Sequence, residues 1–211
     1  RDRDRQLVTK DATIREIHHR VKNNLQTVAA LLRLQSRRMS NSDAKDALKQ
    51  AMGRVSAIAV VHEILSQNFE EQVAFDEVAD RILHMVGDVA ASSGSVVARR
   101  EGSFGEVPAE TATALSLATT ELCQNAIEHS LDSSSGNVIV RSHRTDDALV
   151  VDIVSDGKPL PEGFSLDNHR SSLGLSIVTT LMQDLGGTFT LEDNSDRVGT
   201  CARLVIPLQR L

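Results

Sequence analysis

The 211-residue sequence contains no tryptophan, no tyrosine and only five phenylalanines. Its hydrophobic cores must therefore be built from Leu, Ile, Val and Ala, mostly on helices. Cys123 and Cys201 stand far apart without the spacing of metal ligands, which favours two reduced thiols over a zinc site or a disulfide. No apolar run reaches the roughly 20 residues that cross a bilayer, so we expect a cytoplasmic protein without membrane contact.

The charge balance argues against direct nucleic-acid binding. The net charge is -6 and the pI is near 5.6, whereas a protein that covers phosphates needs clustered Lys and Arg. The length allows two small domains, which we place at residues 1–68 and 69–211. Because the sequence starts without Met and within a repeating pattern, we expect an upstream segment such as a sensor domain.

A heptad pattern runs through the first part of the chain. Two adjacent histidines lie in this pattern: His18 falls on the seam, and His19 lies beside it, where solvent can reach the side chain. Extra apolar residues widen the stripe beyond a two-stranded seam, which favours a bundle of four helices. The seam positions are Ile14, His18, Val21, Leu25, Val28, Leu32, Gln35 and Met39.

The segment Ser40 to Asp43 supplies helix-capping residues, and a second amphipathic helix is predicted over 44–67. Two such helices form an antiparallel hairpin, and two chains then pair into a dimeric four-helix bundle. Residues 19 and 62 are equally far from a midpoint near 40.5. His62 and Glu63 should therefore lie level with His19. His62 is either a half-buried bundle histidine, or else His62 or Glu63 polarises His19.

The pattern changes after residue 69 to alternating strands and helices, typical of an open α/β sandwich. A Gly/Pro/Ser-rich stretch over 155–172 is long enough to predict a mobile lid. The expected elements are a strand over 73–75, a helix over 76–91, a strand over 95–101, a helix over 108–130, strands over 138–144 and 149–154, a helix over 173–185, and strands over 188–192 and 201–206.

Three short sequences could carry chemistry. Glu121, Asn125 and His129 are spaced by four on one helix face, which fits an Mg²⁺ site but also an ordinary solvated face. The sequence Ser155-Asp156-Gly157 ends a strand with an acceptor and a glycine, as needed beside an adenine, although it is equally an ordinary turn.

The third sequence opens a helix with small residues at Ser172 to Leu175. Free backbone N–H groups and the helix dipole at such a start can hold phosphates. Gly174 is the only glycine in this stretch, so the pattern is weak when taken singly.

In their order along the chain, HHRVKNNLQ, ELCQNAIEH, SDG, SLGLSIV and the Gly199-Thr200 pair resemble the kinase core of a bacterial sensor histidine kinase of the HisKA_2/HWE-related class. The resemblance covers nearly the whole chain. It implies a homodimeric helical bundle and an ATP-binding domain of the histidine kinase/gyrase/Hsp90 type. It also implies autophosphorylation on histidine and transfer to an aspartate in the receiver domain of a response regulator, with an RNA-binding ANTAR output suggested.

The resemblance assigns roles to individual residues. It makes His19 the phosphoacceptor in preference to His18, in agreement with the heptad argument. Asn125 would coordinate the Mg²⁺ that bridges the ATP phosphates, with Glu121 as a nearby acidic group. The remaining implied nucleotide-binding positions are His129, Ser155, Asp156, Gly157, Ser172, Leu173, Gly174, Leu175 and Thr200.

The adenine site departs from the family pattern of Asp, any residue, Gly, any residue, Gly. Ser155 stands at the Asp position, Pro159 stands at the second Gly, and Asp156 comes one residue late. A serine can still accept a hydrogen bond, but a shift of one residue on a strand turns a side chain to the other face. Ser172 similarly replaces the first glycine of the phosphate-binding stretch.

Three classes of function remain. The sequence favours a histidine autokinase. A catalytically weak pseudokinase that scaffolds a response regulator is favoured by the departure at Ser155 and Pro159. A serine kinase of the anti-sigma type shares the ATP domain, but it lacks the histidine-bearing hairpin.

Overall fold

The computed structural model describes residues 2–67, 72–91, 95–131, 135–167 and 172–208. The chain divides into two compact units. The first comprises Arg1–Val73 and Glu106–Ser116, and the second comprises Ala74–Gly105 and Leu117–Leu211. The expected boundary between residues 68 and 69 lies outside the described residues.

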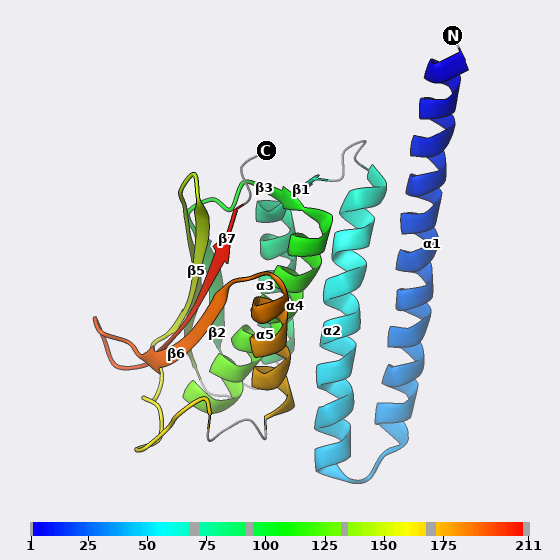
Figure 1. Cartoon of the computed structure of the whole chain (residues 1–211). Helices are drawn as coiled ribbons and strands as arrows, with labels where there is room; N and C mark the ends of the chain where they lie inside the picture. The colour runs from blue at the N-terminus through cyan, green and yellow to red at the C-terminus, as the bar shows by residue number, and fades with distance from the viewer. Residues whose placement is uncertain (1, 68–71, 92–94, 132–134, 168–171, 209–211) are drawn as a thin grey trace. The chain divides into compact units, whose positions relative to one another are not determined.

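A helical hairpin forms most of the first unit (Figure 1). It joins α1 (Asp2–Arg38) to α2 (Ser42–Gln67), which confirms the predicted hairpin. The cap of α2 is Asn41, whose Oδ1 accepts hydrogen bonds from the backbone N–H groups of Asp43 at 2.9 Å and Ala44 at 3.3 Å. This cap starts α2 two residues earlier than the sequence pattern predicted.

Helix α2 covers only one side of the apolar stripe that runs along α1. The seam positions that are half-buried are Ile14, His18, Val21, Leu25 and Leu32. The predicted seam residue Val28 is instead exposed. Together with three residues beside the seam it forms a row of large apolar side chains that stay exposed in the single chain, by 43% to 57% of their surface: Ile17, Val28, Leu31 and Leu34. One hairpin therefore leaves part of the stripe uncovered.

A five-stranded mixed sheet forms the second unit, in the order β2-β4-β5-β7-β6. Strand β2 runs parallel to β4, and the other neighbours are antiparallel. The strands are β2 (Val96–Glu101), β4 (Gly136–Arg144), β5 (Ala148–Ser155), β6 (Thr188–Asp193) and β7 (Thr200–Pro207). Two short strands, β1 (Gln72–Ala74) and β3 (Glu106–Pro108), pair separately, and the sequence did not predict β3.

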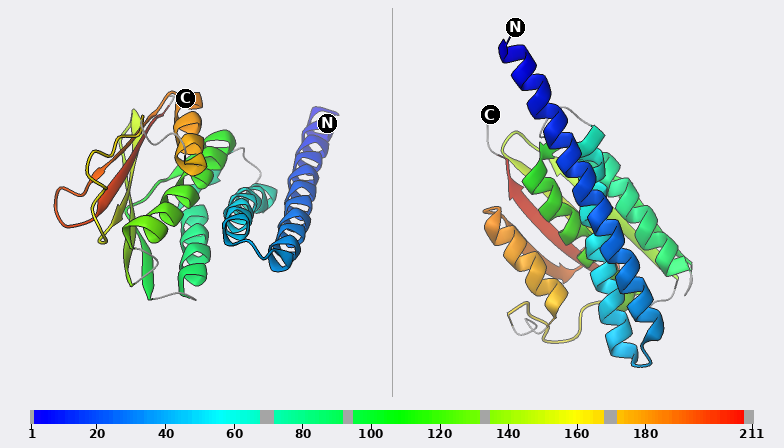
Figure 2. Two further views of the ribbon diagram at one scale, coloured as in Figure 1. Left: turned by 90° about the horizontal axis from the view of Figure 1, so that it is seen from below. Right: turned by 90° about the vertical axis from the view of Figure 1, so that its right-hand side faces the viewer.

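Helices cover one face of this sheet (Figure 2). They are α3 (Phe75–Ala91), α5 (Leu173–Asp184) and the part of α4 (Ala109–Asn125) that belongs to this unit. Strand β5 alternates between buried and half-buried residues, so one side of it faces the core. The buried side chains between sheet and helices include Val78, Ile82, Leu122, Val140, Val151, Ile153, Val178, Met182, Leu204 and Ile206.

The sequence predicted a regular helix up to residue 130, but α4 ends at Asn125 and continues as a single π-helical turn, η1 (Ala126–Ser130). The backbone N–H of Leu131 closes this turn by donating to the carbonyl of Ala126 at 2.9 Å. A π turn adds a residue to the helical repeat, which reorients the side chains that follow it and is frequent at functional sites.

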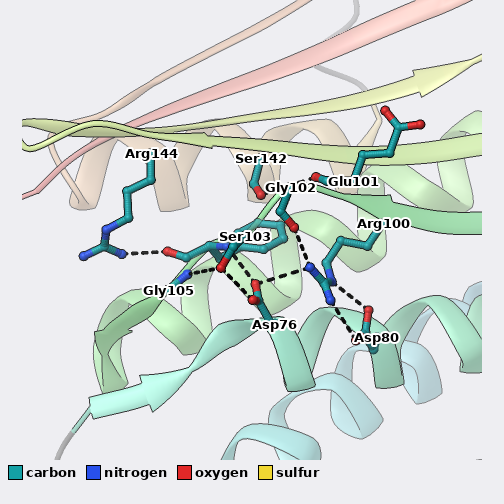
Figure 3. Close-up of polar contacts among 10 residues, drawn as sticks. Asp76, Asp80, Arg100, Glu101, Gly102, Ser103, Gly105, Ser142 and Arg144 are labelled. Carbon is teal, nitrogen blue, oxygen red and sulfur yellow. Dashed lines mark hydrogen bonds and ion pairs between the residues drawn. The ribbon is translucent and has the colours of Figure 1, made fainter.

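A charged network attaches α3 to the segment after β2 (Figure 3). The Asp76 carboxylate accepts hydrogen bonds from the Phe104 backbone N–H and the Ser103 hydroxyl, each at 2.7 Å. Arg100 binds Asp80 through Nε at 2.7 Å and also donates to the Gly102 carbonyl. The first turn of α3 is thereby fixed to the end of β2.

Cys123 and Cys201 are both free thiols. Complete burial raises the pKa of the Cys123 thiol to about 12.

Among the described residues, no helix has both the length and the apolar character that crossing a membrane requires.

Candidate functional site

A cavity of about 250 Å³ opens in the second unit, between the end of α4 with η1 and the strands β5, β6 and β7. Its walls are largely apolar, with Leu122, Ile153, Leu160, Leu191 and Ala202 among them. This volume lies below the ~300–1,000 Å³ typical for whole drug-sized ligands. It therefore suits one flat ring system of a larger ligand.

Hydroxyl groups form one polar part of this cavity. Ser130 and Thr200 line it, and Ser155 connects them from behind. The Ser155 Oγ lies 2.6 Å from the Ser130 Oγ and 2.9 Å from the Thr200 Oγ1, and it accepts the Thr200 backbone N–H at 3.3 Å. These three side chains are buried, so the polar contacts between them are shielded from water.

Two glycines make this arrangement possible. A β-carbon on Gly157 would collide with the backbone oxygen of Ser130, and one on Gly199 would collide with the backbone oxygen of Ser155. Gly199 also has a φ of 135°, which side-chain-bearing residues rarely adopt. The backbone can approach this closely only because both positions are glycine.

Asp156 turns away from the cavity. Its Oδ1 accepts the Asn137 backbone N–H at 2.7 Å, and its Oδ2 accepts the Asn137 side-chain amide at 2.6 Å. Partial burial alone would raise the pKa of Asp156, but these hydrogen bonds outweigh it and lower the pKa below its usual value. Ser155, buried at the end of β5, therefore occupies the inward position next to an outward Asp156.

Asn125 and His129 both line the cavity, one at the end of α4 and the other in η1. Glu121 lies one helical turn earlier and is 5% exposed. A β-carbon built on Gly174 would lie 2.5 Å from Glu121 Oε2, so the start of α5 passes directly against this carboxylate. Asn125 and His129 thus line the same cavity, whereas Glu121 lies next to Gly174 at the start of α5.

The other residues expected in the phosphate-binding stretch lie outside the cavity lining. Ser172 is the N-cap of α5, and its side chain makes no capping hydrogen bond. Leu173 is 63% exposed. Leu175 is buried and borders a separate cavity of about 190 Å³ with Leu166. Residues 168–171 of the predicted lid lie outside the described residues.

The two adjacent histidines have different surroundings within the hairpin. His18 is half-buried, and its Nδ1 lies 2.9 Å from the Nδ1 of His62. His19 is exposed, and its Nδ1 lies 3.3 Å from the Asn23 side-chain nitrogen. Burial, followed by repulsion from His18, lowers the pKa of His62. The expectation of a half-buried bundle histidine at position 62 is therefore confirmed, whereas the expectation that His62 is level with His19 and polarises it was wrong by one residue.

The residues can accommodate a magnesium ion. Asn125 offers an amide oxygen at the cavity, and Glu121, one helical turn earlier, offers a carboxylate next to Gly174 at the start of α5. Oxygen ligands of this kind suit Mg²⁺, which usually keeps several waters and completes its shell with substrate phosphates. The described residues contain no cluster of three or more His, Cys, Asp or Glu side chains that would form a metal site alone.

Sequence reasoning missed Ser130 and Asn137. Ser130 joins the hydroxyl cluster across 25 residues of sequence, and Asn137 is the partner that holds Asp156 outward. The position of Ser130 at the end of the helix that carries Asn125 was the one available signal. Its contact with Ser155 depends on the π turn, which the sequence did not predict.

Comparisons with known proteins agree with this arrangement. A family described as histidine kinase matches residues 16–90, and a family described as histidine kinase-, DNA gyrase B- and HSP90-like ATPase matches residues 110–210. The sensor histidine kinase PdtaS of Mycobacterium tuberculosis is 50% identical over 99% of this chain and 42% of its own length. PdtaS of Mycolicibacterium smegmatis is 48% identical over the same shares. The chain thus spans about two fifths of the length of these relatives.

The solved structure of the histidine kinase domain of EL346, a blue-light activated histidine kinase from Erythrobacter litoralis, superposes with a TM-score of 0.67. It is 26% identical and covers 99% of this chain and 95% of its own. The hairpin, the sheet with its helices and the two family matches lead to one conclusion: the chain belongs to the histidine kinase family and is similar to PdtaS over nearly its whole length.

Proposed function

We propose that this chain is the core of a sensor histidine kinase that uses ATP and Mg²⁺ to phosphorylate itself on His19. The observation that carries the proposal is the contrast between the adjacent histidines. His18 is engaged with His62 inside the hairpin, whereas His19 presents an exposed imidazole. An exposed, neutral imidazole nitrogen is a competent nucleophile toward a phosphoryl group.

Asn23 favours Nε2 as the reacting nitrogen of His19. Its amide lies at Nδ1, so Nδ1 is occupied while Nε2 is open. The Asn23 amide nitrogen only donates, so Nδ1 accepts this hydrogen bond and its lone pair is occupied. In the reaction Nε2 gives up its proton to solvent and forms the bond to the γ-phosphorus, the bond from that phosphorus to the ADP oxygen breaks, and ADP leaves.

The second unit would hold the nucleotide. Its apolar cavity would take the base, and the hydroxyls of Ser130 and Thr200, which line that cavity, would contact the polar edge of the ring. The first turn of α5, next to Gly174, offers backbone N–H groups and a positive dipole to the phosphates. Mg²⁺ at Asn125 and near Glu121 would neutralise phosphate charge, and positioning would supply most of the remaining rate enhancement.

The exposed apolar row on α1 supports a homodimer, in which two hairpins bury this row in a four-helix bundle. A receiver domain of a response regulator, with an ANTAR output, would then accept the phosphoryl group on an aspartate. We place the hairpin domain at residues 1–68 and the ATP-binding domain at residues 69–211.

The test is incubation of the purified chain with γ-labelled ATP, once with Mg²⁺ and once with a chelator. We expect acid-labile, alkali-stable label on the chain only when Mg²⁺ is present. The absence of label on a folded, dimeric chain that binds ATP would overturn the proposal. That result would favour the alternative of a pseudokinase scaffold, which Ser155 and Pro159 at the adenine site make the second candidate.

A further inference from the structure

One polar part of the cavity proposed for the nucleotide is made of hydroxyl groups, and the other polar lining residues are Asn125, His129 and Lys158. The described residues that line the cavity include no Asp and no Glu, and Asp156 is held outward by Asn137. Ser130, Ser155 and Thr200 are 5%, 1% and 8% exposed, so their hydrogen bonds form in a shielded environment. We call these three residues the hydroxyl triad.

The hydrogen atoms of the triad can be assigned by counting donors. The Ser130 hydroxyl donates to the Lys158 backbone carbonyl at 3.0 Å, which uses its one proton. The 2.6 Å contact with Ser155 therefore has Ser155 as donor. The Thr200 hydroxyl then donates to Ser155 Oγ at 2.9 Å, since Ser155 has already used its own proton.

Thr200 can reverse its role at low cost. In the arrangement above, its Oγ1 keeps lone pairs that accept a hydrogen bond from a ligand N–H. If the hydroxyl instead turns toward a ligand oxygen, Ser155 Oγ still accepts the Thr200 backbone N–H at 3.3 Å and is not left without a donor. The same oxygen therefore serves as acceptor or donor.

A carboxylate cannot do this, because an ionised Asp only accepts hydrogen bonds and repels a ligand carbonyl. Adenine presents an amino group at position 6 of the purine ring, and hypoxanthine and guanine present an oxygen there. From this difference we propose that the hydroxyl triad lets the cavity bind 6-oxopurine nucleotides as well as adenine nucleotides. The inference rests on the proposed function, because it assumes that the cavity holds the base with position 6 of the purine next to Thr200.

The test compares binding of ADP and IDP to the whole chain by titration calorimetry in the presence of Mg²⁺. IDP is the chosen probe because its base carries the oxygen at position 6 without the added 2-amino group of guanine. For the parent chain we expect the two dissociation constants to agree within about tenfold, since neither base leaves the triad unpaired.

Two variants should change this ratio. Ser155→Asp places a carboxylate at the triad and should weaken IDP relative to ADP by about tenfold or more. Thr200→Val removes the hydroxyl that can donate to a ligand oxygen. The remaining hydroxyl at the cavity, Ser130, donates its proton to the Lys158 carbonyl and can only accept from a ligand, so this variant should also weaken IDP relative to ADP. The matched control is Thr190→Val on β6, which is exposed and should keep the parent ratio.

The outcomes separate the inference from the proposed function. ADP binding with IDP weaker by about a hundredfold in the parent chain would overturn the inference and leave the kinase proposal intact. A parent ratio within about tenfold that neither variant changes would also contradict it, because the triad would then not set the preference. Failure of both nucleotides to bind the folded chain would overturn the proposed function and the inference together.

Discussion

His18 and His62 face each other across the helical hairpin, with their Nδ1 atoms 2.9 Å apart and their ring centroids 5.2 Å apart. One ring must donate and the other accept, so this hydrogen bond requires that the pair is not doubly protonated. The contact occupies His18 and leaves the neighbouring His19 as the exposed imidazole of the helix. It also ties the α1 residue beside the proposed phosphoacceptor to α2.

The stability of the chain should fall in mild acid because of this pair. Burial and repulsion from His18 lower the pKa of His62 below its usual 6.5. As the pH falls, the unfolded chain therefore binds a proton at His62 at a higher pH than the folded chain does. The contribution of neutral His62 to the free energy of unfolding is complete above about pH 6.5, and it is lost as the pH falls through the lowered pKa of His62 in the folded chain. His62→Gln should make the urea-unfolding free energy less pH-dependent across this window.

The control for this measurement is His84→Gln. His84 lies on α3 with its side chain 80% exposed, and it should keep the pH profile of the parent. An unaltered profile in His62→Gln would show that the pair does not couple protonation to folding.

Asp76 should be a main support of the second unit. Asp76→Ala removes the acceptor for the Phe104 N–H and the Ser103 hydroxyl, and it leaves Arg100 with one carboxylate partner fewer (Figure 3). We expect a loss of about 1–3 kcal/mol in the free energy of unfolding. Asp88→Ala, at a 69% exposed position on the same helix, should change it by less than about 0.5 kcal/mol in chemical denaturation. Equal effects of the two changes would refute this role.

Gly174 should be needed for nucleotide binding rather than for folding. Gly174→Ala puts a β-carbon 2.5 Å from Glu121 Oε2, so α5 or the carboxylate must shift where the phosphates are proposed to bind. We expect ADP affinity to fall by about tenfold or more. Gly87→Ala is the control: a β-carbon there meets nothing within 4 Å, and it should stabilise α3 by about 0.5–1 kcal/mol with ADP affinity unchanged. Parent-like ADP affinity in Gly174→Ala would contradict the proposed phosphate site.

Leu31 should hold the dimer together. It is 57% exposed in the single chain and lies in the apolar row of α1. Leu31→Glu should convert the dimer to a monomer in sedimentation equilibrium, because it would bury a charge in the bundle. Val97→Glu changes a similarly exposed apolar residue, at 51%, on β2 and should leave the dimer intact. A dimeric Leu31→Glu chain would place the dimer interface elsewhere.

The elements with long periodic patterns could be predicted from sequence. The hairpin followed from the heptad spacing, and α3, α5 and the strands of the sheet lie within about two residues of their predicted bounds. Sequence also placed Asn125, His129 and Thr200 among the candidate nucleotide-binding residues, and the structure brings these three to one cavity.

The other features of the fold and the site depend on local geometry that leaves no periodic pattern in the sequence. The Asn41 cap shifts the hairpin midpoint to residue 40, which pairs His62 with His18 rather than His19. The π turn at Ala126–Ser130 leaves no sequence pattern, yet it ends at Ser130, which contacts Ser155. Strand β3 has three residues, the last of them Pro108, and is too short for an alternating pattern.

The most direct measurement of the central claim is labelling by γ-labelled ATP and Mg²⁺ of three chains in parallel: the parent, His18→Gln and His19→Gln. If His19 is the phosphoacceptor, acid-labile, alkali-stable label appears on the parent and on His18→Gln, and none appears on His19→Gln. Label on His19→Gln at the parent level would show that the phosphoacceptor is another residue.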